Sequence, residues 1–364
     1  MKIAFFGSSL VSAYWNGAAT YYRGIIRALA DLGHLVTFYE PDAYGRQQHR
    51  DMDDPDWARV VVYSAEGENA ARAALEEASA ADMIVKTSGV GVFDELLEAA
   101  VLDIRRPGMI VAFWDVDAPA TLDRLHANPA DPFRRLIPRY DLILTYGGGG
   151  PVVDAYLSYG ARACYPIYNA ADPETHHPAP PDPRFMGVCG FLGHRLPDRE
   201  QRVEEFFLKP AARLPEKRFL LGGNAWEDKP MPPNVEYLGY VSTNDHNAFN
   251  SSLQTVLNIN RASMARYGFS PPTRVFEVAA AGGCLITDAW EGIELFLEPG
   301  REVLVAADGD AVADYLSWLT PGQARAIGAM ARRRILAEHT YRHRAVQVQR
   351  ILDAEHVQQK VRVS

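Results

Sequence analysis

Long apolar runs, cysteines and excess positive charge are all scarce in this sequence, and each absence excludes a class of protein. No apolar segment approaches the ~20 residues that a membrane-spanning helix needs. Cys164, Cys189 and Cys284 lie far apart in apolar segments without the spacing of metal ligands, so we expect small core thiols in a reducing compartment. The apolar run in the N-terminal MKIAFFGSSL is too short for a signal peptide. Together these features predict a cytoplasmic location.

Positive charge does not dominate the chain as a whole. The net charge of −9 argues against a broad nucleic-acid-binding surface. The charge is uneven, however, and the C-terminal part from Gly322 onward has nine basic against three acidic residues. A solvated helix face is the preferred interpretation of this tail. Peripheral contact with an anionic membrane surface or an acidic acceptor stays open.

Two ligand-binding signatures are also missing. Gly7 is followed by no second glycine until Gly17, so the first strand lacks a G-x-G-x-x-G dinucleotide fingerprint. No Asp-x-Asp pair follows a strand of the second half, and we therefore predict no required metal ion and no cofactor besides the substrate. Asp115 and Asp117 have that spacing in the first half, which leaves a metal interpretation open there.

The chain does contain enough material for two cores. Its 364 residues, 48% hydrophobic and 23% charged, suit two globular domains. Strand-like and helix-like segments alternate in both halves, which predicts α/β domains with doubly wound parallel sheets. The predicted parts are a first domain over 1–170, a Pro-rich linker over 171–185, a second domain over 186–338, and a C-terminal helix over 339–364 that packs back toward the first domain. Such domains bind ligands at the carboxyl edges of their strands, with a cleft between them.

The expected strands follow from short apolar segments. In the first half they are 2–6, 35–39, 82–86, 109–114, 141–145 and 163–167. In the second half they are 187–192, 219–221, 235–238, 255–259, 284–287 and 302–305. The four glycines at 147–150 suit either a close approach of the backbone or a mobile loop, and the mobile loop is the preferred interpretation.

The most informative segment lies between residues 258 and 307. A Gly-Phe-Ser-Pro-Pro loop, 268–272, precedes a short helix that carries Arg274 and Glu277. A helix N-terminus binds phosphate through its free N–H groups, and an arginine there adds a forked donor. A glutamate one turn later is placed to accept both hydroxyls of a ribose. The alternative is a simple i,i+3 ion pair between the two side chains, worth only ~0.2–0.5 kcal/mol.

Several motifs together resemble a known family. They are FWDVDAP (113–119), FLGHRLPDRE (191–200), NVEYLGYV (234–241), LNINR (257–261), the run 268–283, DAWEGIELF (288–296) and HTYRHRAVQVQRIL (339–352). In their order they resemble the GT-B fold glycosyltransferases of group 1, and most closely the branch of the spore-maturation protein CgeB. The resemblance implies two Rossmann-like domains facing across a cleft. It also implies transfer of a sugar from a nucleoside-diphosphate sugar to an unidentified acceptor.

The resemblance carries roles to particular residues of the second domain. Glu277 stands where the family holds the ribose, and Tyr240 lies in the segment that packs on the base. Of the two arginines in the first loop of this domain, Arg195 is preferred over Arg199 as the phosphate contact. The residues implied at the diphosphate are Gly193, Arg195, Asn260, Arg261, Ser270, Pro271 and Arg274. Phe269 replaces the first of two glutamates found in many of these enzymes, so retaining and inverting mechanisms both stay open.

The first domain has its own candidates at the end of the strand 109–114. Asp115 and Asp117 are the predicted catalytic carboxylates, since inverting transfer needs a base at the acceptor hydroxyl. Asp117 also suits a helix N-cap before Pro119, so Asp115 is preferred as the base or acceptor contact. Trp114 is either a sugar-stacking residue or core, and the loop with Asn16 and Gly17 is expected to face the cleft and the acceptor.

Two other functions fit the same motifs. A non-catalytic relative would bind a sugar nucleotide or a partner as a scaffold. A nucleotide-sugar epimerase would use the same donor site with acid and base groups around a sugar that stays bound. The motifs name neither the nucleotide, the sugar nor the acceptor, because a site for phosphate and ribose is generic.

Overall fold

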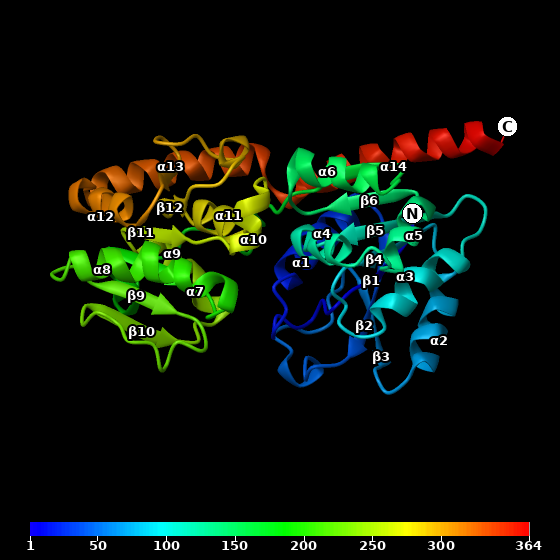
Figure 1. The fold of residues 1–364 in the computed structure, drawn as a ribbon, viewed down its shortest axis with the longest axis horizontal. Helices are drawn as coiled ribbons and strands as arrows, with labels where there is room; N and C mark the ends of the chain where they lie inside the picture. Colours follow the sequence, from blue (N-terminus) through cyan, green and yellow to red (C-terminus); the bar gives the residue numbers. More distant parts are fainter. Residues whose placement is uncertain (364) are drawn as a thin grey trace. The chain divides into compact units, whose positions relative to one another are not determined.

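The protein consists of two α/β units, as shown in Figure 1. The computed structural model describes residues 1–363, with side chains up to residue 357. Unit 1 contains residues 1–169 and the C-terminal helix from residue 341, and unit 2 contains residues 170–340. The chain therefore passes between the units twice, at 169/170 and at 340/341.

Unit 1 is built on a parallel sheet in the order β3-β2-β1-β4-β5-β6-β7. Its strands are β1 Lys2–Phe6, β2 Leu35–Asp42, β3 Arg59–Ser64, β4 Met83–Thr87, β5 Ile110–Asp115, β6 Leu142–Thr145 and β7 Cys164–Pro166. Its helices are α1 Ala19–Asp31, η1 Gln47–His49, α2 Glu68–Ala78, α3 Asp94–Asp103, α4 Ala118–Ala127, α5 Phe133–Leu136, η2 Ile137–Arg139, α6 Gly149–Ser158 and α14 Tyr341–Val363. The direction of the crossovers reverses at β1, which is the arrangement of a doubly wound sheet.

Unit 2 repeats the plan with a parallel sheet in the order β10-β9-β8-β11-β12-β13. The strands are β8 Cys189–Leu192, β9 Phe219–Gly222, β10 Val235–Gly239, β11 Thr255–Asn258, β12 Leu285–Asp288 and β13 Leu304–Ala306. The helices are η3 Pro183–Phe185, α7 Pro197–Val203, η4 Glu204–Leu208, α8 Lys209–Arg213, η5 Thr243–Asp245, α9 His246–Ser252, α10 Ala262–Tyr267, α11 Thr273–Ala280, η6 Ile293–Leu295, α12 Gly309–Trp318 and α13 Pro321–Glu338.

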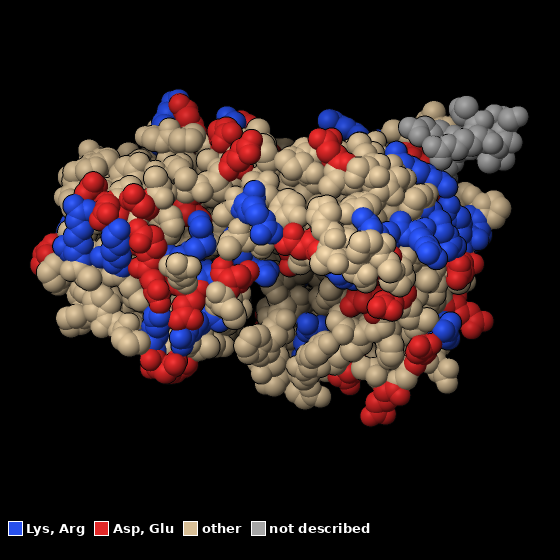
Figure 2. Space-filling view, in the orientation of Figure 1, with Lys and Arg blue, Asp and Glu red and all other residues tan. Residues whose placement is uncertain are grey.

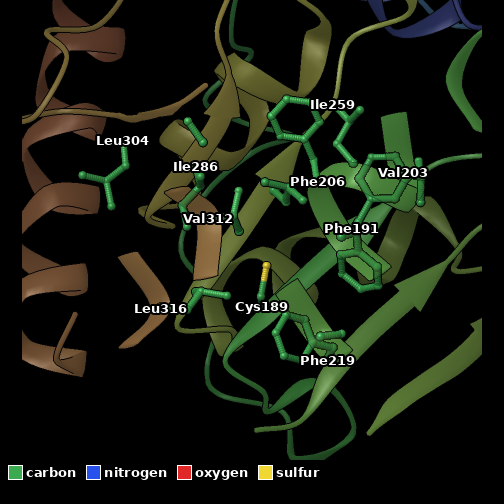
Figure 3. Close-up of a cluster of buried hydrophobic side chains, with 14 of the residues drawn as sticks. Cys189, Phe191, Val203, Phe206, Phe219, Ile259, Ile286, Leu304, Val312 and Leu316 are labelled. Carbon is green, nitrogen blue, oxygen red and sulfur yellow. The ribbon is translucent and has the colours of Figure 1, made fainter. Parts of the chain in front are cut away.

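The strands form because they are continuous apolar segments that the sheet buries on both faces. All six residues of β5 are buried, as expected for a central parallel strand. In unit 2 one cluster of the core contains Phe191, Phe219 and Ile286 of the sheet together with Val312 and Leu316 of α12 (Figure 3). The cysteines are free and buried, and Cys189 lies in this core.

The glycines at 147–150 begin a helix, so their interpretation as a mobile loop is wrong. Gly148 is the N-cap of α6 with a φ of 89°, and a Cβ there would lie 1.9 Å from Val152 Cγ2. Glycine is therefore required by the left-handed backbone and the close packing of the first turn.

The Pro-rich segment 171–185 also differs from a free linker. Its backbone N–H groups at His177, Ala179 and Asp182 donate to Asn247, Ser251 and Ser252, at 3.3, 3.1 and 2.8 Å. Prolines leave few donors in this segment, and side chains of α9 satisfy three of them. The segment is thus a docked part of unit 2.

The final helix α14 belongs to unit 1 and packs on α1. Gly24 of α1 permits this packing, because a Cβ there would lie 2.1 Å from the Tyr341 ring. Arg344 of α14 donates to the carbonyls of Tyr168 and Asn169 at the last residues before unit 2. Among the described helices, none combines the length and the apolar character that a membrane crossing needs.

Candidate functional site

The candidate site in unit 2 lies where β8, β11 and β12 end. These strands are neighbours in the sheet, so the residues after each strand meet at one edge. Helix α11 starts near this edge, and its N-cap Pro272 makes no side-chain capping bond. The first N–H groups of a helix have no partner within the helix, so they are available to a ligand.

Two loops hold the start of α11 in place. Phe269 has a φ of 46°, and its N–H donates to the Glu291 carbonyl at 2.6 Å. Gly292 has a φ of 99°, and a Cβ there would lie 2.4 Å from the Phe269 ring. The residue that replaces the family's first glutamate therefore serves as a packing anchor for the loop leading to Ser270.

Arg274 of α11 is directed back under the strand ends. Its Nη1 donates to Asn258 Oδ1 at 3.0 Å, its Nη2 donates to the Leu192 carbonyl, and its guanidinium lies 5.0 Å from the Phe191 ring centre. Burial, and then the positive charge of Arg199, lower the pKa of Arg274 to about 10. This arginine is held in a fixed position near a second cation.

Arg199 is the unpaired cation of the site. Its Nε is buried and lacks a hydrogen-bond partner, and within the described residues no carboxylate forms an ion pair with it. Burial, followed by the charge of Arg261, lowers the pKa of Arg199. A buried guanidinium near two others is costly unless an anion completes the site.

Arg195 lies in a different environment from the one preferred on sequence grounds. Its guanidinium bonds to Glu200 and Asp228, at 2.7 Å each. Figure 2 shows basic and acidic side chains interleaved over α7 and α8, where such pairs are common. Arg261 is also paired, with Asp198 at 2.7 Å. The geometry therefore favours Arg199 over Arg195 as the phosphate contact.

Other buried donors near the strand ends also lack partners. Asn260 Nδ2 and Ser270 Oγ have none in the part of the chain that the structure describes, although both residues are almost fully buried. The backbone of Asn260 is fixed, because its N–H donates to both carboxylate oxygens of Asp288 at 3.2 Å. Native proteins rarely leave such groups unsatisfied, so these donors point to a missing acceptor.

Gly193 lets the backbone pass close to Arg199. A Cβ at Gly193 would lie 2.7 Å from the Phe191 ring and 3.0 Å from Arg199 Nη1. Its neighbour His194 accepts a bond from the Asn224 N–H at 3.1 Å, and burial, then Arg199, lowers its pKa. Small size is thus needed at Gly193 for the arginine to occupy its position.

Glu277 faces two histidines rather than Arg274. His176 Nε2 lies 3.9 Å from Glu277 Oε1, and within the described residues no ion pair joins Glu277 to Arg274. The i,i+3 ion-pair alternative is therefore wrong. Burial lowers the pKa of His246 while Glu277 opposes that shift. Sequence analysis missed both histidines, because they come from the Pro-rich segment and from the start of α9.

Tyr240 follows the edge strand β10, and 66% of its surface is exposed. The strand end is fixed, since the Gly223 N–H donates to the Gly239 carbonyl at 2.8 Å and Gly239 has a φ of 67°. An exposed ring and accessible backbone at this position are compatible with packing on a base.

Asp115 of unit 1 is fully buried, and its role as a catalytic base is not supported. Its carboxylate accepts bonds from Ser88 Oγ at 2.7 Å, Asp117 N at 3.0 Å, Thr121 Oγ1 at 3.1 Å and Tyr156 Oη at 2.5 Å. Burial, and then the charge of Asp115, raise the pKa of Tyr156, so its hydroxyl keeps its proton. The carboxylate thus organises the end of β5.

The neighbouring candidates separate by exposure. Trp114 is 1% exposed and donates to Tyr21 Oη at 2.9 Å, so it belongs to the core and does not stack on a sugar. Asp117 is the N-cap residue of α4, but its side chain makes no capping bond. Because Asp117 is partly exposed at the strand end, it is the better-placed carboxylate of the two.

Asn16 and Gly17 lie in the loop between β1 and α1. Asn16 is buried and holds the loop, with Ser8 Oγ donating to Oδ1 at 2.9 Å and Nδ2 donating to the carbonyls of Ser9 and Ser12 at 2.8 and 3.0 Å. Gly17 is exposed, with open space where a Cβ would lie. Asn16 therefore shapes this loop, whereas Gly17 leaves its surface accessible.

Comparison with solved structures gives the same architecture for the whole chain. HepE from Anabaena, in complex with UDP and glucose, matches with a TM-score of 0.70 at 14% identity, over 97% of this chain and 100% of that chain. Sucrose-phosphate synthase from Thermosynechococcus elongatus matches with a TM-score of 0.68 at 15% identity, over 100% of both chains. The protein has the GT-B fold, as predicted.

Sequence comparison agrees for part of the chain. Residues 199–350 match the model of a family described as glycosyl transferase-like. No curated protein matches this chain in sequence. An alpha-glucosyltransferase in complex with UDP and DNA also matches in structure, with a TM-score of 0.68 at 13% identity, over 97% of this chain and 99% of that chain. The match to the CgeB branch stays a prediction.

Proposed function

We propose that the protein is a glycosyltransferase that moves a sugar from a nucleoside-diphosphate sugar to an acceptor. The observation that carries the proposal is the partly buried guanidinium of Arg199 near Arg274, whose Nε is buried and has no partner within the described residues, at the edge where Asn260 and Ser270 also leave donors unsatisfied. A diphosphate supplies the acceptor oxygens and the negative charge that this arrangement lacks.

The position of Glu277 supports a nucleoside next to the diphosphate. Glu277 lies one turn after Arg274 in α11, and its carboxylate contacts no donor closer than His176 at 3.9 Å within the described residues. A carboxylate whose oxygens accept no hydrogen bond from the described residues, one helical turn after the proposed phosphate contact, suits the two hydroxyls of a ribose. Tyr240 and the end of β10 are then available to the base.

The catalytic contribution of this site is electrostatic. When the sugar is transferred, negative charge develops on the departing diphosphate. Arg199, Arg274 and the N-terminus of α11 are already in place to stabilise that charge. Arg199 and Arg274 are the positively charged side chains of unit 2 that we propose for this role.

A binding experiment tests the donor site. UDP is the first probe, because two of the similar structures contain it, followed by GDP, ADP, dTDP and CMP. A ligand at ~100 times its dissociation constant adds ~2.7 kcal/mol of stability and raises the melting temperature. We expect stabilisation of the wild type and of Arg333→Gln, an exposed arginine of α13. Arg199→Gln should lose most of it.

Transfer is tested with the matching nucleotide sugar and a set of acceptors, by release of the nucleoside diphosphate. Release that needs an acceptor and is lost in Arg199→Gln supports the proposal. If no nucleotide stabilises the protein, the proposal is wrong.

A non-catalytic, sugar-nucleotide-binding relative is the second candidate. One observation favours it: Asp115, the expected base, is sequestered by four donors. This candidate predicts nucleotide binding that depends on Arg199, with no release of nucleoside diphosphate for any acceptor. The transfer assay distinguishes the two.

A further inference from the structure

Unit 1 contains a second arginine that forms no ion pair within the described residues, Arg46, in the loop after β2. The side chain is 7% exposed, and its Nε is buried without a hydrogen-bond partner. Its two other nitrogens donate to main-chain carbonyls, Ser8 at 3.2 Å and Trp15 at 3.5 Å. The first of these bonds has an ordinary length and the second is long. Two such bonds leave most of the five N–H donors of the guanidinium available to a ligand.

No carboxylate neutralises Arg46 by direct contact among the residues that the structure describes. Glu40 contributes to its electrostatic environment but is used elsewhere. Its carboxylate accepts bonds from Ser9 Oγ at 2.9 Å, Leu10 N at 2.6 Å and Gln47 Nε2 at 2.6 Å. Burial is the main reason that the pKa of Arg46 is lowered. A buried, uncompensated guanidinium is unfavourable until an anion binds to it.

The surroundings of Arg46 are those of a ligand site. Arg46 contacts the loop that leads into α1, a helix of 13 residues. The N-cap residue of this helix, Ala18, makes no side-chain capping hydrogen bond. The strands β1 and β2 are adjacent and parallel, so the loops after them meet at the carboxyl edge of the sheet. Ligands of doubly wound sheets bind at this edge.

Exposed aromatic rings lie beside the arginine. Tyr44 is 56% exposed, and its ring centre lies 5.0 Å from the Arg46 guanidinium carbon. Trp15, whose carbonyl accepts from Arg46, is 63% exposed. Both have left-handed backbones, with φ of 58° and 48°. This conformation is unfavourable for aromatic residues and is concentrated at functional loops.

We propose that Arg46 binds the anionic group of the acceptor, and that the acceptor is a phosphorylated or carboxylated sugar. Arg46 forms charge-assisted bonds to the anion, and the exposed rings of Trp15 and Tyr44 pack against the sugar. The identification of this ligand as the acceptor rests on the proposed function. The anion site itself consists of residues of unit 1 alone.

The chemistry of these three side chains selects this class of ligand. A guanidinium presents a planar fork that matches the oxygens of phosphate or carboxylate. Aromatic rings bury the apolar C–H face of a sugar and leave its hydroxyls in water. Neither feature explains a neutral, purely aliphatic acceptor.

Thermal-shift and calorimetric titrations of the full chain test the proposal. The probes are glucose 6-phosphate, glucuronic acid, glucose and inorganic phosphate. At least one of the two anionic sugars should stabilise the protein, whereas glucose should not. Comparison of the two decides between phosphate and carboxylate. Arg46→Gln should weaken binding of the preferred sugar by about tenfold or more.

Three variants control this result. Arg199→Gln removes the donor-site cation and should leave the binding of the anionic sugar intact. Arg72→Gln, an exposed arginine of α2, makes the same charge change elsewhere in unit 1 and should also bind normally. If Arg46→Gln does not fold, Trp15→Ala replaces it. Trp15→Ala should weaken binding of the anionic sugar and leave that of inorganic phosphate unchanged.

The outcomes separate this inference from the proposed function. Loss of nucleotide binding in every test would remove the donor site and leave the Arg46 titrations interpretable. If nucleotides bind but neither anionic sugar does, the inference fails alone. It also fails if Arg46→Gln folds and binds the anionic sugar as the wild type does, or if Arg199→Gln abolishes that binding.

Discussion

His176 Nε2 lies 3.9 Å from Glu277 Oε1, which brings the Pro-rich segment 171–185 to the helix that carries the proposed nucleotide site. The segment is docked on α9 by three side-chain acceptors, so His176 is held there by the fold of unit 2. Both side chains are largely buried, with 8% of the His176 side chain and 15% of the Glu277 side chain exposed. The fold therefore holds the Glu277 carboxylate in a defined position.

Glu277→Gln should separate ribose binding from phosphate binding. The variant keeps the size of the side chain and loses the charge that accepts two hydroxyls. We expect affinity for UDP, or for whichever nucleotide binds best, to fall about 10- to 100-fold, which is ~1.4–2.7 kcal/mol. Affinity for pyrophosphate should not fall. Calorimetric titration measures both, with the exposed Glu294→Gln as control. Equal losses for the two ligands would show that Glu277 does not contact the ribose.

His246 should make the protein less stable in mild acid. The folded-state pKa of His246 is lowered below the value of about 6.5 that it has in an unfolded chain, mainly because the side chain is buried. At a pH between the two pKa values, His246 is therefore protonated in the unfolded chain and neutral in the folded protein. The stabilisation is complete above pH ~6.5 and is lost as the pH falls toward the folded-state pKa.

Urea unfolding at pH 7.5 and pH 5.5 measures this effect. The decrease in unfolding free energy on acidification should be smaller in His246→Gln than in the wild type. His126→Gln, an exposed residue of α4, should leave the decrease as it is in the wild type. The prediction is contradicted if the unfolding free energy of His246→Gln decreases on acidification by as much as that of the wild type.

Asp115→Asn should act on stability. The carboxylate accepts from four donors in a fully buried position, and an amide cannot accept from all of them. We expect a loss of ~2–4 kcal/mol in the unfolding free energy. Asp117→Asn, two residues away and partly exposed, should change it by less than ~0.5 kcal/mol. Chemical denaturation checks both, and equal stabilities would refute the structural role of Asp115.

Asp117→Asn should instead act on transfer. If Asp117 is the base for the acceptor hydroxyl, its loss removes general-base catalysis worth ~10²–10⁴ in kcat. Nucleotide affinity should not change, because Asp117 belongs to unit 1 and the donor site to unit 2. Single-turnover kinetics with the best nucleotide sugar measure the step. A kcat within about twofold of the wild type would exclude Asp117 as base.

Gly223→Ala should destabilise unit 2. Gly223 has a φ of 123°, and a Cβ there would lie 2.2 Å from the Gly193 carbonyl oxygen, a backbone atom that cannot rotate away. We expect a loss of more than ~2 kcal/mol, together with weaker nucleotide binding because Gly193 borders Arg199. Gly322→Ala, in the first turn of α13 with open space around it, should be neutral or stabilising. Thermal unfolding compares the two.

Much of the fold was predictable because its signals are local. The apolar segments at 2–6, 110–115 and 285–288 are strands, as their composition indicates, and the alternation with helices predicts parallel sheets. Strand β3 was missed because it lies at the edge of its sheet and only Tyr63 in it is buried. Edge strands lack the continuous apolar pattern that identifies central ones.

The arrangement of residues at the start of α11 was predictable for a similar reason. The loop 268–272, Arg274 and Glu277 lie close together in sequence, so their juxtaposition at the start of α11 follows from helix geometry alone. The choice between Arg195 and Arg199 did not follow, since both lie in one loop region and only the packed structure gives Arg195 its two carboxylate partners.

By itself, the sequence determined two parallel α/β units and a helix N-terminus that carries Arg274 and Glu277, because hydrophobic periodicity and short-range spacing fix these features. Only the tertiary structure decided that Asp115 and Trp114 are buried, that His176 reaches Glu277, and that within the described residues neither Arg199 nor Arg46 forms an ion pair with a carboxylate. Burial and pairing depend on residues far apart in the chain. A charged side chain at a strand end becomes a site or a structural link according to the neighbours that folding gives it.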